Sequence, residues 1–148
     1  MKERHRITGF YLETLLLIVV FIAIILVLTQ VFGLGKRQSS QAELLTNAVC
    51  LAQNAAEAVS ASDSPEAVAA LLNRGENARV VSGYVQAGYS RDMTPESGDA
   101  PALLVRIGWE PTAGDERMIH STIQVFHSGQ QEPLYTLETA VFLGEVGA

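Results

Sequence analysis

The order of apolar and polar positions separates a hydrophobic amino-terminal run from a mixed, mostly polar remainder. A polar and mostly basic start ends at Gly9, and Glu13 is the last charged residue before an uncharged run from Thr14 to Gly35. At ~1.5 Å per residue in a helix, this run covers ~33 Å, which matches the ~30 Å hydrocarbon thickness of a bilayer. Its central residues are apolar on every side, whereas a helix at the edge of a protein core shows a polar stripe. We therefore predict one transmembrane helix.

Two kinds of removable segment compete with a retained anchor. A secretory signal peptide has an apolar core of ~7–15 residues, followed by a small-x-small cleavage site. The run here is longer, and residues 31–35 (Val-Phe-Gly-Leu-Gly) do not form a convincing site of this kind. A lipoprotein would use Cys50, but Val49 stands where a small residue is expected, and Cys50 lies far beyond the run. The retained anchor is the favoured interpretation.

A second helical pattern follows the apolar run directly. Apolar residues recur there at intervals of three and four, which predicts an amphipathic helix from Gln38 to Ser60; they are Ala42, Leu45, Val49, Ala52, Ala56 and Val59. No proline precedes Pro65, so the two helices are expected to join into one. Gly33 and Gly35 are its weakest points, each costing ~1 kcal/mol relative to alanine, and they mark a candidate hinge.

The pattern then changes to a short helix and several strands. Asp63-Ser64-Pro65-Glu66 is a helix-start signature, which predicts a helix from Pro65 to Asn73 with Gly75 as its stop. Alternating apolar positions predict strands at 103–110, 118–127 and 134–143, and a less regular one at 79–89. Turns at 111–115 and 128–133 connect the last three strands as antiparallel hairpins, and 90–101 is predicted to be a polar loop.

These elements predict an α+β fold, in which a long amino-terminal transmembrane and amphipathic helix packs on a small antiparallel β-sheet. The amphipathic helix and the one-sided sheet each need a partner to bury their apolar faces. The expected organisation is a basic leader at 1–9, a transmembrane helix at 10–35, its amphipathic continuation at 36–60, and a globular domain at 61–148 that holds a short helix and the strands.

Charge and cysteine content narrow the function classes. From Gln38 onward the chain carries five arginines and fourteen carboxylates, a net charge of −9, which argues against direct nucleic-acid binding. One cysteine allows no internal disulfide, and Cys50 is interpreted as a small buried hydrophobe in preference to an intermolecular bridge. Lys2, Arg4 and Arg6 precede the apolar run and only Lys36 and Arg37 follow it closely, so we expect a cytoplasmic amino terminus and an extracytoplasmic domain in a single-pass cell-membrane protein.

Catalytic, cofactor and metal sites receive little support. His120 and His127 are seven residues apart on one predicted strand, so their side chains project to opposite faces and cannot share a metal. Asp92, Glu96 and Asp99 lie in one loop, but their spacing matches no calcium cage, and a solvated acidic loop is favoured. Phosphate-binding glycine loops and nucleophile elbows are missing from the sequence. We expect no enzyme activity, no metal and no cofactor.

The amino-terminal residues carry a resemblance to a known family. Gly9-Phe10, followed by Glu13 and a long apolar helix, resembles the signature of type IV pilins and of the pseudopilins of type II secretion. The strand containing Val105-Arg106-Ile107-Gly108-Trp109 and the one containing Thr122-Ile123-Gln124-Val125 are similar in order to those of smaller, minor pilin-like subunits. The signature covers about the first thirty-five residues, and beyond it the likeness is one of architecture only.

The resemblance implies a processing and assembly mechanism. A prepilin peptidase would cleave after Gly9, and Phe10 would become the new and commonly methylated amino terminus. The Glu13 carboxylate would meet the terminal amine of a neighbouring subunit, because two unpaired charges in a dry helical bundle cost more than a paired couple. The family glutamate usually stands fifth from the cleaved end, whereas Glu13 is fourth, which favours a minor or priming subunit. The lack of proline in the apolar helix is a second departure.

Two hypotheses follow. In the first, the chain is a minor pilin-like subunit of a type IV pilus or a type II secretion-like pseudopilus, and its partners are other pilin-like subunits, the prepilin peptidase, the inner-membrane pilus or secretion platform and the lipid bilayer. In the second, it is a bitopic, signal-anchored membrane protein whose small extracytoplasmic domain binds a partner. Under this second hypothesis Glu13 is a hydrated carboxylate among the lipid headgroups.

Overall fold

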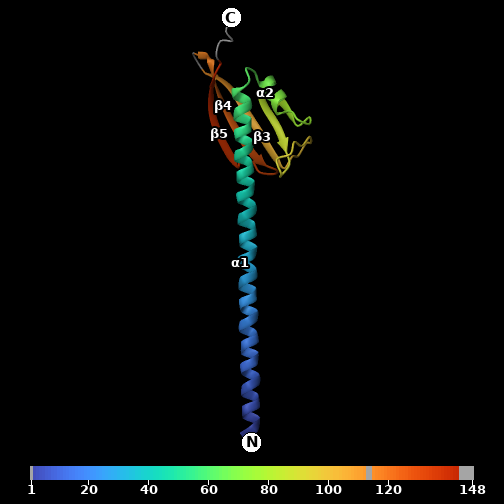
Figure 1. Cartoon of the computed structure of the whole chain (residues 1–148), viewed down its shortest axis with the longest axis vertical. Coiled ribbons are helices and arrows are strands. Elements are labelled where there is room, and N and C mark those ends of the chain that lie inside the picture. Colours follow the sequence, from blue (N-terminus) through green and yellow to red (C-terminus); the bar gives the residue numbers. More distant parts are fainter. Residues whose placement is uncertain (1, 113–114, 144–148) are drawn as a thin grey trace. The chain divides into compact units, whose positions relative to one another are not determined.

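The computed structural model describes residues 2–112 and 115–143 and confirms the α+β class. Two helices precede a five-stranded antiparallel sheet whose strands are hydrogen-bonded in chain order, a simple meander (Figure 1). The elements are α1 (Lys2–Ser60), α2 (Pro65–Leu72), β1 (Ala78–Val81), β2 (Tyr84–Tyr89), β3 (Leu103–Thr112), β4 (Asp115–His127) and β5 (Tyr135–Phe142). The chain divides into two compact units, Met1–Ala42 and Glu43–Ala148, and the second contains the sheet, α2 and the last turns of α1.

The strand register places matched rows of apolar side chains on one face of the sheet. Val85, Ile107, Ile123 and Leu137 lie opposite one another across β2 to β5. The first three of these side chains are fully buried, and Leu137 packs against them at the edge. Because side chains alternate along a strand, the residues between them form a second face of different character. That second face carries polar residues and a few aromatic rings.

The last turns of α1 cover the apolar face of the sheet with small side chains. The residues buried there are mostly alanines, and they recur at helical spacing; they are Ala48, Leu51, Ala52, Ala55, Ala58 and Val59. The predicted stripe was only partly right, because Ala52 and Val59 are buried but Ala42 and Leu45 are exposed. This stretch of the helix is rich in alanine on several sides, so hydrophobicity alone does not fix which side faces the sheet. The buried side is the one that carries Leu51 and Val59 together with the four alanines.

Helix α2 begins where its capping signature places it. The Ser64 hydroxyl accepts a hydrogen bond from the Ala67 amide at 3.3 Å, and Pro65 occupies the first turn. Substituting such a cap with alanine typically costs ~1 kcal/mol. The helix ends at Leu72 with Asn73 as the C-cap, so the prediction that Gly75 stops it was off by two residues.

The segment predicted as one irregular strand, 79–89, is instead a hairpin of β1 and β2. Ser82 and Gly83 connect the two strands, and both have positive φ angles, 52° and 83°. Two consecutive residues of this kind form the tight turn whose twist matches a two-stranded ribbon, and glycine at the second position adopts it without strain. The Ser-Gly pair is a weaker turn signal than Asn-Gly, which explains why the alternating pattern alone concealed it.

The next hairpin is tighter than predicted. The proposed turn at 111–115 was too long, because β3 continues through Pro111 and Thr112 and β4 begins at Asp115, with a register shift between Pro111 and Thr112. Ala113 and Gly114 lie outside the described residues. The final turn, 128–133, connects β4 to β5 as expected.

The polar loop from 90 to 101 is confirmed as irregular chain and is fixed to the sheet through Gly88. The Gly88 amide donates to the Asn77 carbonyl at 2.9 Å, and the Gly88 carbonyl accepts from the Glu96 amide at 3.0 Å. A Cβ atom added at Gly88 would lie 2.7 Å from the Glu96 carbonyl oxygen, so only glycine allows this close approach. The Asn47 side-chain amide also donates to the Arg91 carbonyl at 2.9 Å, which attaches the loop to α1.

Truncation of a central core side chain tests this packing. Ile107→Ala should lower the free energy of unfolding by about 2–5 kcal/mol, because Ile107 is fully buried in the row that faces α1. The matched control is Leu71→Ala on α2, where the side chain is 51% exposed, and its effect should stay within about 0.5 kcal/mol. Denaturant unfolding of the detergent-solubilised chain, followed by Trp109 fluorescence, measures both. Equal losses would contradict the assignment of this face as the core.

Alkaline pH should destabilise the domain through Tyr89. Burial raises the pKa of the Tyr89 phenol above its ordinary value of 10.0, against smaller opposing effects of a hydrogen bond with Asn77 and the charge of Arg74. The unfolded chain therefore releases this proton first, and the stabilisation, complete below about pH 10, is lost as pH rises toward the folded pKa. Tyr89→Phe should reduce the loss of unfolding free energy between pH 8 and pH 11, measured by denaturant titration. If Tyr89→Phe loses as much unfolding free energy between pH 8 and pH 11 as the unsubstituted protein, the loss comes from other groups.

Candidate functional site

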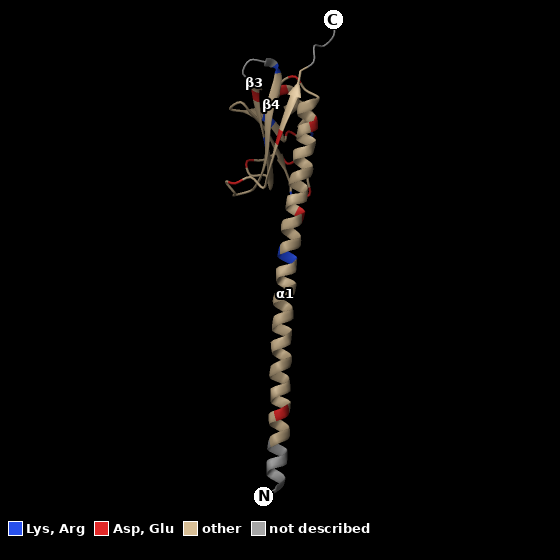
Figure 2. Cartoon of the chain, turned by 90° about the vertical axis from the view of Figure 1, so that its left-hand side faces the viewer, with Lys and Arg blue, Asp and Glu red and all other residues tan. Residues whose placement is uncertain are grey.

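The amino-terminal unit of α1 presents apolar side chains on all sides. Every large hydrophobic side chain between Phe10 and Leu34 is exposed, from 46% at Ile25 to 76% at Phe32. Figure 2 shows the long uncharged section of the helix that follows Glu13. Among the described residues, α1 is the one helix long and apolar enough to cross a membrane, and the apolar stretch is not buried in the protein, unlike the core helix of a soluble protein. A helix of this kind is consistent with a single-pass membrane anchor.

The two threonine hydroxyls within the apolar stretch are satisfied by the helix itself. The Thr14 hydroxyl donates to the Phe10 carbonyl at 2.9 Å, and the Thr29 hydroxyl donates to the Ile25 carbonyl at 2.8 Å. Unpaired polar groups cost several kcal/mol in hydrocarbon, so hydroxyls that bond back to the preceding turn suit a lipid environment. The helix passes without a break through Gly33 and Gly35, where sequence analysis placed a candidate hinge.

The three residues proposed for processing and assembly lie on the first turns of this helix. Gly9, Phe10 and Glu13 are all exposed within α1, and the Phe10 ring packs edge-on against Tyr11 with 6.4 Å between centroids. Phe10 and Glu13 are three residues apart, so they lie on adjacent turns of one side of the helix. Within the described part of the chain, Glu13 forms no ion pair or side-chain hydrogen bond. Its carboxylate must therefore be solvated or be paired by another molecule.

The other candidate residues do not gather into a site. His120 is exposed on β4, and His127 lies half-buried at the end of the same strand. Across the described residues there is no cluster of three or more histidine, cysteine or acidic side chains able to hold a metal. Cys50 is a half-buried free cysteine on α1. Asp92, Glu96 and Asp99 are exposed in the loop.

The aromatic residues of the strands divide between the two faces of the sheet. Trp109 and Tyr135 pack against the core. Phe142 is 59% exposed, and Phe126 lies on the opposite face, beneath an arginine that the sequence did not single out.

Comparisons with known proteins assign no family. No protein-family model matches the sequence, and neither a curated protein nor a solved structure is significantly similar to it. The functional interpretation therefore depends on the residues of this chain alone.

A charge in the middle of the apolar stretch should oppose membrane insertion. Ile24→Lys should raise the apparent insertion free energy by about 2.5–3.5 kcal/mol, the cost of lysine at the centre of a bilayer. The control is Gln53→Lys, at an exposed position of α1 within the second unit, and it should leave insertion unchanged. A glycosylation-site insertion assay in microsomes measures both variants. Normal insertion of Ile24→Lys would indicate that this stretch does not occupy hydrocarbon.

Proposed function

We propose that this protein is a minor pilin-like subunit that assembles through its amino-terminal helix in a type IV pilus or a type II secretion-like pseudopilus. In this role it is a structural protein without catalytic activity. Its partners are other pilin-like subunits, a prepilin peptidase, an inner-membrane assembly platform and the bilayer. The small sheet domain faces the extracytoplasmic side, and the amino terminus faces the cytoplasm.

The observation that carries the proposal is the exposed, unpaired Glu13 immediately before an exposed apolar stretch of α1. A carboxylate at the border of hydrocarbon is costly unless water or a cation accompanies it, so its position is itself a functional signal. Gly9 and Phe10 stand just before it, as the cleavage site of the pilin-like signature requires. The α+β domain is compatible with this class of subunit.

Cleavage after Gly9 would create the cation that Glu13 lacks. The new amino terminus at Phe10 would carry a positive charge at the membrane boundary, one turn away from its own Glu13. In an assembly, the same two groups from adjacent subunits would neutralise one another, and removing either would leave a charge uncompensated in a low-dielectric bundle. The pair would also fix how far neighbouring helices shift along their axes, because the attraction falls with distance.

The spacing of Glu13 points to a specialised position in the assembly. Relative to a new first residue at Phe10, the carboxylate is fourth, whereas the family pattern places it fifth. One residue rotates a side chain by ~100° around a helix with ~3.6 residues per turn. The contact made by Glu13 would therefore differ from the repeating contact of a bulk subunit, as expected for a priming or tip-proximal subunit.

The alternative is a bitopic, signal-anchored protein with an uncleaved amino terminus. The long apolar helix and the small sheet domain fit such a protein as well. Under this alternative, Glu13 is hydrated among headgroups and takes part in no assembly. Intact-mass measurement on membrane-extracted protein distinguishes the two, because assembly requires a chain that begins at Phe10. Retention of Met1 in cells with an active prepilin peptidase would exclude the assembly function.

Removal of the Glu13 charge tests the assembly step separately from processing. Glu13→Gln should leave insertion and cleavage intact but lower helix-to-helix crosslinking by about tenfold or more, since losing one partner of a buried ion pair costs about 3–5 kcal/mol. A photo-crosslinking amino acid in place of Phe21, which is exposed, reports contacts with other pilin-like subunits.

Glu43→Gln is the matched control for this measurement. It removes the same charge from an exposed position of the same helix, beyond the apolar stretch, and should not change crosslinking. Unchanged crosslinking in Glu13→Gln as well would favour the interfacial, hydrated carboxylate.

A further inference from the structure

Arg106 occupies the sheet face that points away from α1, and no acidic residue stands beside it in register. Its cross-strand neighbours are Gln86 on β2 and Gln124 on β4. Among the described residues, Arg106 makes no ion pair, and its recorded interactions are with aromatic rings. This is unusual in a domain with fourteen carboxylates and five arginines from residue 38 onward. No acidic side chain of the described residues therefore neutralises this cation.

Two aromatic rings hold the guanidinium in place. Its central carbon lies 5.2 Å from the centre of the Phe126 ring and 5.9 Å from that of Tyr84. Gly108 lies opposite Tyr84 in register, and the Tyr84 ring lies over it. The Arg106 Nε atom is buried and has no hydrogen-bond partner. The side chain is thus held by cation–π contacts, and its terminal nitrogens are the donors that remain for a ligand.

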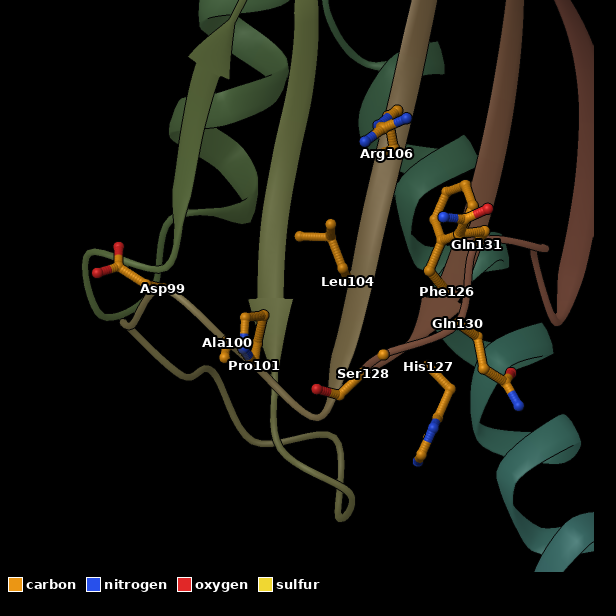
Figure 3. A pocket seen from close by; sticks show the side chains of 11 residues that line it. Asp99, Ala100, Pro101, Leu104, Arg106, Phe126, His127, Ser128, Gln130 and Gln131 are labelled. Carbon is orange, nitrogen blue, oxygen red and sulfur yellow. The ribbon is translucent and has the colours of Figure 1, made fainter.

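A hollow of about 460 Å³ lies beside this guanidinium, a volume within the range of sites for small ligands. Leu104 and Phe126 form part of its wall, as do the loop segment 99–101 and the turn after β4 (Figure 3). In Figure 3, Asp99 lies on the loop across the hollow from Arg106. The hollow therefore combines one fixed cation, an aromatic surface and an aliphatic wall.

We propose that this hollow binds a carboxylate that is attached to an apolar group. The terminal nitrogens of Arg106 would donate two parallel hydrogen bonds to the planar carboxylate, a geometry that guanidinium matches better than ammonium does. The apolar group would rest on Phe126, Leu104 and Pro101. A singly charged anion fits better than a phosphate dianion, because Asp99 lines the hollow and the surrounding domain is acidic. A peptide chain end and a free small acid share this chemistry.

The binding test uses the full chain in detergent micelles and a matched pair of probes, N-acetylphenylalanine and its uncharged amide. A ligand of this size should bind with a Kd on the order of 1 mM. The acid should shift the Nε–H resonance of Arg106 in a saturable way, and the amide should not. Equal shifts with both probes, or no saturation by the acid at about tenfold that concentration, would overturn the proposal.

Variants locate the binding in the hollow. Arg106→Gln should abolish saturable binding of the acid, which is followed through the resonances of Ser128 and Gly129. Arg106→Lys should weaken the binding about tenfold, because lysine keeps the charge but not the planar donor pair. Arg79→Gln is the matched control: it removes an exposed charge from β1, outside the hollow, and should change Kd by less than about twofold in physiological salt. Unchanged binding in Arg106→Gln would overturn the proposal.

A variant that retains Arg106 distinguishes loss of binding from loss of the fold. Phe126→Ala removes the aromatic surface and should weaken binding of the acid about tenfold while the amide resonances of β3 remain in place. A tripeptide that ends in phenylalanine, tested as free acid and as amide, then separates the two sources of carboxylate. Tighter binding of the peptide acid than of N-acetylphenylalanine assigns the site to a peptide chain end, and equal or weaker binding assigns it to a small acid.

Discussion

The packing of the alanine-rich side of α1 against the sheet is the contact on which the second unit, Glu43–Ala148, depends. A five-stranded meander has two faces, and its apolar face needs a cover to be stable in water. Helix α2 has only eight residues, too few to cover the sheet alone. The last turns of α1 supply the rest, and their small side chains at Ala48, Ala52 and Ala55 let the strands approach closely. The domain therefore cannot be separated from its helix without exposing its core.

Helix α1 combines two kinds of sequence. Between Phe10 and Leu34, large aliphatic and aromatic side chains point outward in every direction, which suits lipid. After Glu43, small residues gather on one side and polar residues occupy the other, which suits a protein core that borders water. The backbone hydrogen bonds continue throughout, so no loop is needed at the boundary.

The sequence predicted the elements well where one physical signal dominated. The uncharged run predicted the anchor-like helix, the Ser64-Pro65 cap placed α2, and strict alternation located β3 to β5. It failed where signals were weak or ambiguous. The Ser82-Gly83 turn was hidden in an alternating pattern, and alanine on several sides of α1 left the buried face undetermined. Arg106 was overlooked for a different reason. It lies between Val105 and Ile107 in an alternating strand pattern, where a charged residue is normally assigned to the solvent-exposed face. Its isolation from acids depends on cross-strand register, which one sequence does not reveal.

The described residues leave two charges of opposite sign without an ion-pair partner, Glu13 and Arg106. The free-energy cost of leaving each charge unpaired depends on its surroundings, so the two have different implications. Glu13 is exposed on a helix, so water alone can satisfy it unless hydrocarbon surrounds it. Its significance therefore grows with the depth of the helix in the membrane. Arg106 is held between rings with one donor buried, so water satisfies it incompletely wherever the domain lies. Native proteins depart from local consistency mainly at functional sites, and such departures persist only when something compensates for them. For the charge of Glu13 the natural compensation is a cation from a neighbouring chain, and for the charge of Arg106 it is an anion that enters the adjoining hollow and pairs with the terminal nitrogens of the guanidinium.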